Sequence, residues 1–202
     1  MKWSEFQPYV LPYVIGCPDP VLEHHARLTA IDFCRKTACM AVTLDPEQTD
    51  GFTLDVQPLA DTGLQILRLL SVTLDGHAMP LVSTSHGLEL VAHGYGNEFA
   101  FARDGATIAI NPLQDAGVQV VAHAVLGPSF ASTTVPDALL PHVQDIAHGA
   151  IASIQMVPGQ TFTAPDFAAA QRDMYQRRVS TVAASVSRGR TPAKMRSRTT
   201  YL

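Results

Sequence analysis

The stretch LLPHVQDIAHGAIASIQMVPG, residues 139–159, decides how the C-terminal half of this chain folds. Its apolar side chains recur at the spacing of one helix face. That face consists of Leu139, Val143, Ile146, Ala147, Ala150 and Ile154. Gly149 and Ser153 extend it with a flank of small residues, and Val157-Pro158-Gly159 ends the helix. The stretch therefore predicts an amphipathic helix that needs a partner for its apolar face.

Gly149 is the unusual residue of this helix. A glycine inside a helix costs about 1 kcal/mol relative to alanine. Another segment passing close to the helix would explain why the position is occupied by glycine. We therefore predict close helix packing, within one subunit or between subunits. The residues expected to make these contacts are Phe33, Ala147, Gly149, Ala150 and Phe167.

Two further helices are predicted on either side of this one. Thr163-Ala164-Pro165-Asp166 opens the last helix, which runs to about Gly189. Its candidates for burial are Phe167, Met174, Val179, Val182 and Val186. An earlier helix is expected over residues 21–36, where two apolar strips are formed by Leu22, Ala26, Ala30 and Phe33 and by Leu28 and Ile31. Since each apolar face needs a partner, the first helix should pack on the last two.

Between the first and second helices the apolar pattern changes to period two, which is typical of strands. The predicted strands cover residues 40–44, 52–56, 64–74, 77–82, 99–102, 107–110 and 118–126. Asp75-Gly76 and Asp104-Gly105 are strong two-residue hairpin turns, and Gly127-Pro128 is expected to stop the last strand. About seven short strands at this spacing favour a small β-sandwich or an open barrel.

This order predicts an α+β fold. We expect a three-helix bundle with an inserted antiparallel β-sandwich or barrel and an extended C-terminal tail. The expected divisions are an N-terminal arm and first helix over 1–39, a β domain over 40–130, two helices over 131–188 and a tail over 189–202. A chain of 202 residues is long enough to bury a core of this kind.

The charge of the chain is unevenly distributed. Seven of the 14 Lys and Arg residues lie in residues 177–202, and none of the 18 Asp and Glu residues does. The segment SRGRTPAKMRSRTTYL, residues 187–202, has too few apolar residues to fold alone. We expect it to dock on a protein partner, with phosphate contacts or a solvated tail as alternatives. The candidate docking residues are Arg188, Arg190, Lys194, Arg196, Arg198 and Tyr201.

The sequence contains no recognised motif of catalysis. It has no glycine-rich phosphate loop, no Gly-x-Ser-x-Gly elbow and no His-Glu-x-x-His pair. Its eight histidines lack ligand spacing, so we expect no catalytic residue, no metal and no cofactor. A nucleophilic pair of Cys34 with a histidine stays open. Three cysteines indicate reduced thiols in a cytosol, and neither a signal segment nor a membrane span is expected.

Two segments together carry a resemblance. One is LPYVIGCP, residues 11–18, followed by Ala26, Ala30, Phe33, Cys34 and Thr37. The other is HVQDIAHGAIA, residues 142–152, with MVPGQ at 156–160, and Phe99, Gly105 and residues 108–112 fit the same pattern. From about residue 3 to about 178 the chain resembles the head-to-tail adaptor proteins of tailed bacteriophages, relatives of the tail tubular protein A group. Phe162 stands where many relatives have tryptophan.

The resemblance implies a structural virion protein and not an enzyme. It implies a ring of about twelve copies in the phage neck, made in the bacterial cytoplasm, that joins capsid to tail and lines the DNA exit channel. Its partners would be the portal protein, tail or nozzle proteins, and phage DNA passing without sequence-specific binding. The alternatives are another neck ring such as a tail terminator, a nucleic-acid-binding protein, or a small enzyme with an unrecognised site.

Overall fold

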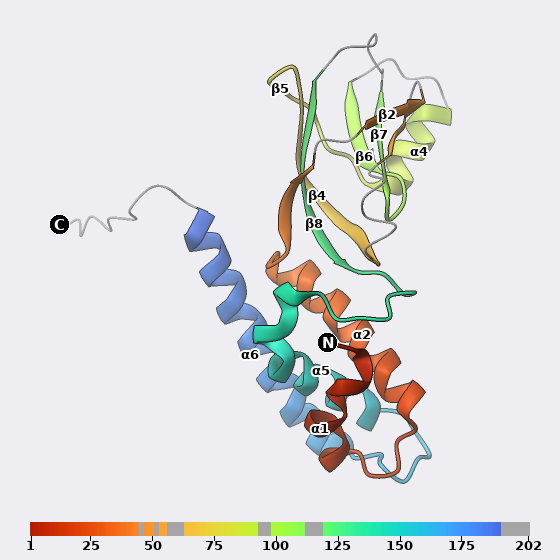
Figure 1. Cartoon of the computed structure of the whole chain (residues 1–202), viewed down its shortest axis with the longest axis vertical. Helices are drawn as coiled ribbons and strands as arrows, with labels where there is room; N and C mark the ends of the chain where they lie inside the picture. Colours follow the sequence, from red (N-terminus) through yellow and green to blue (C-terminus); the bar gives the residue numbers. More distant parts are fainter. Residues whose placement is uncertain (45–46, 51–52, 56–62, 93–97, 112–118, 191–202) are drawn as a thin grey trace, which may run out of the picture.

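The protein is a mixed α+β structure with antiparallel sheets, as the sequence predicts. The computed structural model describes residues 1–44, 47–50, 53–55, 63–92, 98–111 and 119–190. The long helices form one end of the molecule, and the strands with one shorter helix form the other (Figure 1). In sequence, all the strands lie between α2 and α5.

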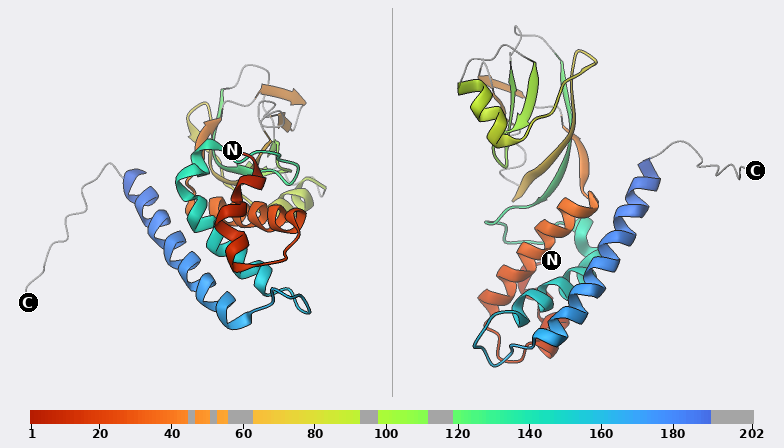
Figure 2. Two further views of the ribbon diagram at one scale, coloured as in Figure 1. Left: turned by 60° about the horizontal axis from the view of Figure 1, so that its bottom comes forward. Right: turned by 180° about the vertical axis from the view of Figure 1, so that it is seen from behind.

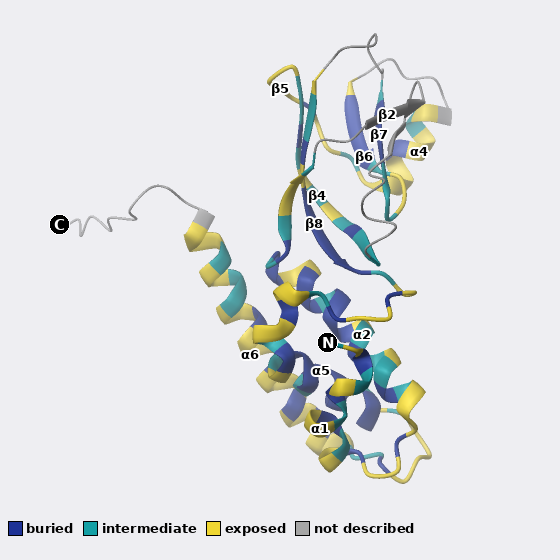
Figure 3. Cartoon of the chain, viewed as in Figure 1, coloured by how far each residue is buried: buried dark blue, intermediate teal, exposed yellow. Residues whose placement is uncertain are grey.

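Three long helices form the helical end. They are α2 (Asp19–Thr37), α5 (Val143–Gln155), which the 3-10 helix η3 (Asp137–His142) precedes, and α6 (Pro165–Arg190). Helix α2 packs on both α5 and α6, which also pack on each other (Figure 2). The predicted arrangement of the first helix against the last two is therefore confirmed. Most residues of α5 are buried, as the dark blue of this helix in Figure 3 shows.

The prediction of burial is wrong for three large side chains of these helices. Phe167 and Met174 of α6 are 42% and 46% exposed, and Leu28 of α2 is 37% exposed. The buried positions of α6 are Ala168, Gln171, Tyr175 and Val179. These follow each other by three or four residues and so define one helix face. Phe167 and Met174 lie on a different row of the helix, where Phe167 stacks on Tyr13.

The predicted N-terminal arm covers the helical end, and its short helices were not predicted. It consists of η1 (Trp3–Phe6), α1 (Gln7–Val10) and η2 (Leu11–Tyr13). Trp3, Phe6 and Val10 are buried, and the rings of Trp3 and Phe6 stack with their centroids 5.7 Å apart. Helices of three or four residues leave no helical period in the sequence, so tertiary packing has to fix them.

The strands form two four-stranded sheets. The first has the order β1-β8-β4-β5, with β1 (Ala41–Leu44), β8 (Val120–Pro128), β4 (Leu64–Leu74) and β5 (His77–Ala78). The second has the order β2-β3-β7-β6, with β2 (Glu47–Asp50), β3 (Thr53–Asp55), β7 (Thr107–Asn111) and β6 (Phe99–Ala102). Long strands β4 and β8 pair from Leu64↔Pro128 to Leu74↔Val120.

The structure differs from the predicted β region in several respects. The described residues form eight strands rather than about seven, and no closed barrel is found among them. Strand β8 includes Gly127 and ends at Pro128, two residues later than predicted. A proline is tolerated at the end of a strand because no N–H donor is needed there. Strand β5 is much shorter than predicted. A helix, α4 (Thr84–Ala92), follows and contacts β6.

The helical end and the first sheet share one hydrophobic core. A single cluster of buried residues includes Phe33 and Cys34 of α2 together with Ala122, Ala124 and Leu126 of β8. The second sheet contributes Ala100, Ile108 and Ile110 to the same cluster. It also has a separate small cluster made of Phe99, Phe101 and Ala109, with Val82 and Leu90 packed against it. The predicted boundary at residue 40 therefore does not divide the core.

Candidate functional site

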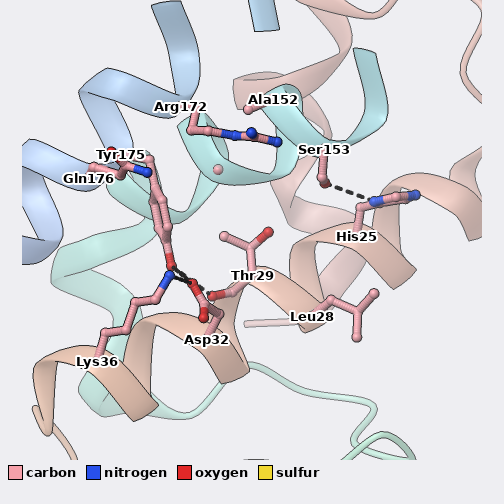
Figure 4. Close-up of a pocket in the computed structure, with 11 residues that line it drawn as sticks. His25, Leu28, Thr29, Asp32, Lys36, Ala152, Ser153, Arg172, Tyr175 and Gln176 are labelled. Atoms are coloured by element: carbon pink, nitrogen blue, oxygen red, sulfur yellow. Dashed lines mark hydrogen bonds and ion pairs between the residues drawn. The ribbon is translucent and has the colours of Figure 1, made fainter. Parts of the chain in front are cut away.

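A groove of about 350 Å³ opens between the three long helices (Figure 4). We call it the interhelical groove. Helix α2 contributes His25, Leu28, Thr29, Asp32 and Lys36; α5 contributes Gly149, Ala152 and Ser153; α6 contributes Arg172, Tyr175 and Gln176. Pockets of this size with an apolar lining and a few polar groups are typical of binding sites.

Gly149 allows the three helices to approach closely at the floor of this groove. A Cβ atom on Gly149 would lie 2.5 Å from Cγ2 of Thr29 and 2.9 Å from Cδ2 of Tyr175. Real Cβ atoms do not approach other atoms so closely, so the position requires glycine. The predicted packing residues Phe33, Ala147, Gly149 and Ala150 are all buried, whereas Phe167 is exposed. Ala147 lines the hollow beside the N-terminal arm rather than the interhelical groove.

Tyr175 connects α6 to α2 across the groove. Its hydroxyl donates a hydrogen bond of 2.9 Å to Oδ2 of Asp32, and Nζ of Lys36 lies 2.7 Å from the same oxygen. Burial, followed by the negative charge of Asp32, raises the pKa of the Tyr175 phenol well above its usual range. The phenol therefore stays neutral in the folded protein and remains a hydrogen-bond donor.

We expect Tyr175→Phe to lower the free energy of unfolding by about 1–2 kcal/mol at pH about 9, because it removes a buried hydrogen bond to a charged group. Above pH about 10 a tyrosine in the unfolded chain loses its proton while Tyr175 in the folded protein keeps it, so this tyrosine costs stability as the pH rises. The variant lacks that cost, and the difference from the parent protein should narrow toward pH about 11. Urea unfolding at both pH values measures this.

Tyr9→Phe is the matched control, since Tyr9 is exposed on the N-terminal arm. It should leave both the stability and its pH dependence unchanged. A constant difference between Tyr175→Phe and the parent protein at both pH values would contradict the prediction.

His25 and Ser153 form a second polar contact in the groove. Nδ1 of His25 lies 2.8 Å from Oγ of Ser153, which donates its own hydrogen bond to the carbonyl of Ala150 at 3.0 Å. Burial, followed by the neighbouring His24, lowers the pKa of His25. The hydroxyl of Ser153 is therefore held between the ring of His25 and a backbone carbonyl.

Arg172 supplies the uncompensated charge of the groove. Its guanidinium extends over Ala152 toward Ser153 (Figure 4), and it has no hydrogen-bond or ion-pair partner among the described residues. Lys36 and Asp32 neutralise each other, so the groove has a net positive charge when His25 is neutral. The sequence analysis did not single out Arg172, Tyr175 or Asp32. The one sequence signal for the groove is the spacing of Ala168 and Tyr175, which lie on the buried face of α6.

An exposed apolar surface lies on the other flank of α6. Tyr9, Tyr13, Ile15 and Phe167 are all exposed, and the rings of Tyr13 and Phe167 stack with their centroids 5.9 Å apart. Pro8 and Pro12 of the arm border two hollows, of about 350 and about 600 Å³. We call this surface the aromatic patch. Contiguous apolar patches on a protein surface mark interaction sites.

The predicted docking tail begins where α6 leaves the body of the molecule. The C-terminal end of α6 projects away from the other helices and from both sheets (Figures 1 and 2). Arg188 lies exposed near this end. The side chain of Arg190 and residues Lys194, Arg196, Arg198 and Tyr201 lie outside the described part of the chain. Docking through these residues therefore stays a prediction.

Cys34, the other candidate nucleophile, is fully buried in the shared core. Its Sγ lies 3.7 Å from Sδ of Met40, and a hydrogen bond with Cys39, together with burial, raises the pKa of its thiol. A buried neutral thiol is a poor nucleophile.

Two other kinds of site are absent from the described residues. Over the described ranges, no three His, Cys, Asp or Glu side chains are grouped so that they could hold a metal ion. No helix in the described part of the chain has the length and apolar character needed to cross a membrane. The sequence matches no known protein-family model and no curated protein.

Proposed function

We propose that this protein is a non-enzymatic head-to-tail adaptor that forms a ring beneath the portal of a tailed bacteriophage. In this proposal a three-helix bundle with an inserted β domain builds the ring, and the basic C-terminal segment docks on the portal. The observation that carries the proposal is the course of α6, which leaves the body of the molecule immediately before that basic segment. The resemblance of residues 11–18 and 142–160 to the adaptor proteins supports it.

The two unlike flanks of α6 suit a ring subunit. One flank borders the positively charged interhelical groove, and the other belongs to the aromatic patch. A closed ring of identical subunits requires each copy to bind its neighbour through two different surfaces. The acidic body also suits a channel for DNA, since residues 1–176 carry 18 acidic and 7 basic residues and repel phosphate.

Assembly on isolated portal rings tests this function. Purified protein should sediment as a monomer of 21.7 kDa at micromolar concentration. On adding portal, negative-stain images should show an extra ring of density on one face. The portal is expected to template the ring, because each subunit is then held both by the portal and by its neighbour.

The possible results separate two parts of this proposal. Stable rings in the absence of portal would contradict templating and leave the adaptor function standing. Absence of binding to portal rings, with the protein folded, would contradict the adaptor function itself.

A further inference from the structure

The interhelical groove offers an unpaired positive charge beside an apolar wall. Arg172 is exposed and has no partner among the described residues, and Leu28, which lines the same groove, is 37% exposed. A carboxylate would form a charge-assisted hydrogen bond with the guanidinium. An adjacent apolar side chain would cover Leu28. The groove therefore fits an occupant that carries an acidic group next to an apolar group.

Helix α6 of this chain carries two such pairs on its outer side. Asp166 is followed by Phe167, and Asp173 is followed by Met174. All four residues are exposed, and neither aspartate has a hydrogen-bond or ion-pair partner within the described part of the chain. The two pairs are seven residues apart, which is two helical turns or about 10 Å along the axis. We call this surface the α6 flank.

We propose that the interhelical groove of one copy receives the α6 flank of a second copy, with Arg172 paired to one of its aspartates. This inference rests on the proposed ring and names its subunit interface. Charge complementarity favours a second copy as the occupant, since residues 1–176 are strongly acidic and the basic C-terminal segment would be repelled by Arg172. A portal protein or DNA in the groove would be a different outcome of the test.

The position of the two surfaces on α6 suits contact in a head-to-tail order. Arg172 borders the groove, and Met174 follows it by two residues, which places Met174 about 200° farther round the helix. One copy can therefore use the groove and the α6 flank at the same time, with a different neighbour on each. Such heterologous contacts close into rings.

Photo-crosslinking on portal rings identifies the occupant of the groove. Full-length protein with Leu28→p-benzoylphenylalanine is assembled on portal and irradiated. We expect a covalent dimer whose crosslinked peptide comes from residues 165–178 of a second copy. The control is Arg103→p-benzoylphenylalanine, at an exposed position beyond β6, which should give no crosslink to that peptide.

Charge reversal tests the ion pair itself. Arg172→Glu should lower the occupancy of the ring by about tenfold, because it faces the aspartates with a like charge. Adding Asp166→Arg and Asp173→Arg should recover most of that loss. Arg103→Glu makes the same change in net charge away from both surfaces and should assemble normally. Circular dichroism should show equal folding in every variant.

The possible results distinguish failure of the proposed subunit interface from failure of the proposed adaptor function. Normal assembly of Arg172→Glu, or no recovery in the triple variant, overturns the pairing. Crosslinks from position 28 to the portal, or none in complete rings, overturn the inference and leave the adaptor function intact. A parent protein that never binds portal overturns both.

Discussion

A chain that ends at Ser187 is expected to fold normally and to fail to join portal-bearing capsids. The truncation leaves the shared core and the contacts of α6 with α2 and α5 in place, because the buried residues of α6 end at Val179. It removes Arg188, Arg190, Lys194, Arg196 and Arg198, which no acid compensates in that segment. Thermal melting should show an unchanged body, and the yield of complete particles should fall to background.

Charge variants of the full chain provide the matched control for the truncation. Replacing Arg188, Arg190, Arg196 and Arg198 by Gln keeps the length of the segment and removes most of its charge. Exposed ion pairs contribute only about 0.2–1 kcal/mol each, so the four replacements should weaken attachment to the portal by the sum of small losses. The loss should be larger at low salt, where charges are less screened. Normal particle yield from the truncated chain would show that the segment does not dock.

Gly149→Leu is expected to lower the free energy of unfolding by about 1–3 kcal/mol through overpacking, although leucine favours a helix. The first atom of the new side chain would already overlap Thr29 and the ring of Tyr175. The ring of Tyr175 is held between Phe33 and the hydrogen bond to Asp32 and has little freedom to move. Chemical unfolding monitored by far-UV circular dichroism measures the loss.

Gly189→Leu is the control for helix propensity. Gly189 lies near the end of α6, and no atom lies within 4 Å of the place where its Cβ would stand. This variant should be as stable as the parent protein or slightly more stable. Equal stability of Gly149→Leu and the parent protein, with the groove intact, would disprove the close packing at this helix crossing.

The parts of the fold that the sequence predicted are those with a long regular period. The bounds of β4 match the prediction, and α2 differs by one or two residues at each end. Each of these elements buries one side over many residues, so its pattern is visible without any knowledge of its partner. The same holds for the buried row of α5 through Ile146 and Ala150.

The parts that were missed depend on contacts distant in the sequence. The short helices of the N-terminal arm form because Trp3 and Phe6 are buried on the long helices. Helix α4 begins six residues after β5, in a stretch for which no helix or strand was predicted. The groove has the same origin, since Asp32 and Tyr175 are 143 positions apart and only the fold brings them into contact.

Among the predicted packing residues, Gly149 was placed correctly and Phe167 was not. Close packing was predicted at Gly149 because a glycine inside a helix lowers the stability of that helix, and a segment passing close by explains its presence. Phe167 was placed in the helix core because it is large and apolar, but its row on α6 faces Tyr13 and solvent instead. Size and hydropathy alone could not distinguish the two rows of α6.

The core that runs from Phe33 of α2 into Leu126 of β8 also has a mechanical meaning. A load applied to the first sheet is passed directly to the helices, since sliding one part over the other would open apolar surface to water. The second sheet joins the same core through Ala100, Ile108 and Ile110 and adds a small cluster of its own. Under pulling or pressure, the long helices and both sheets should therefore resist deformation together.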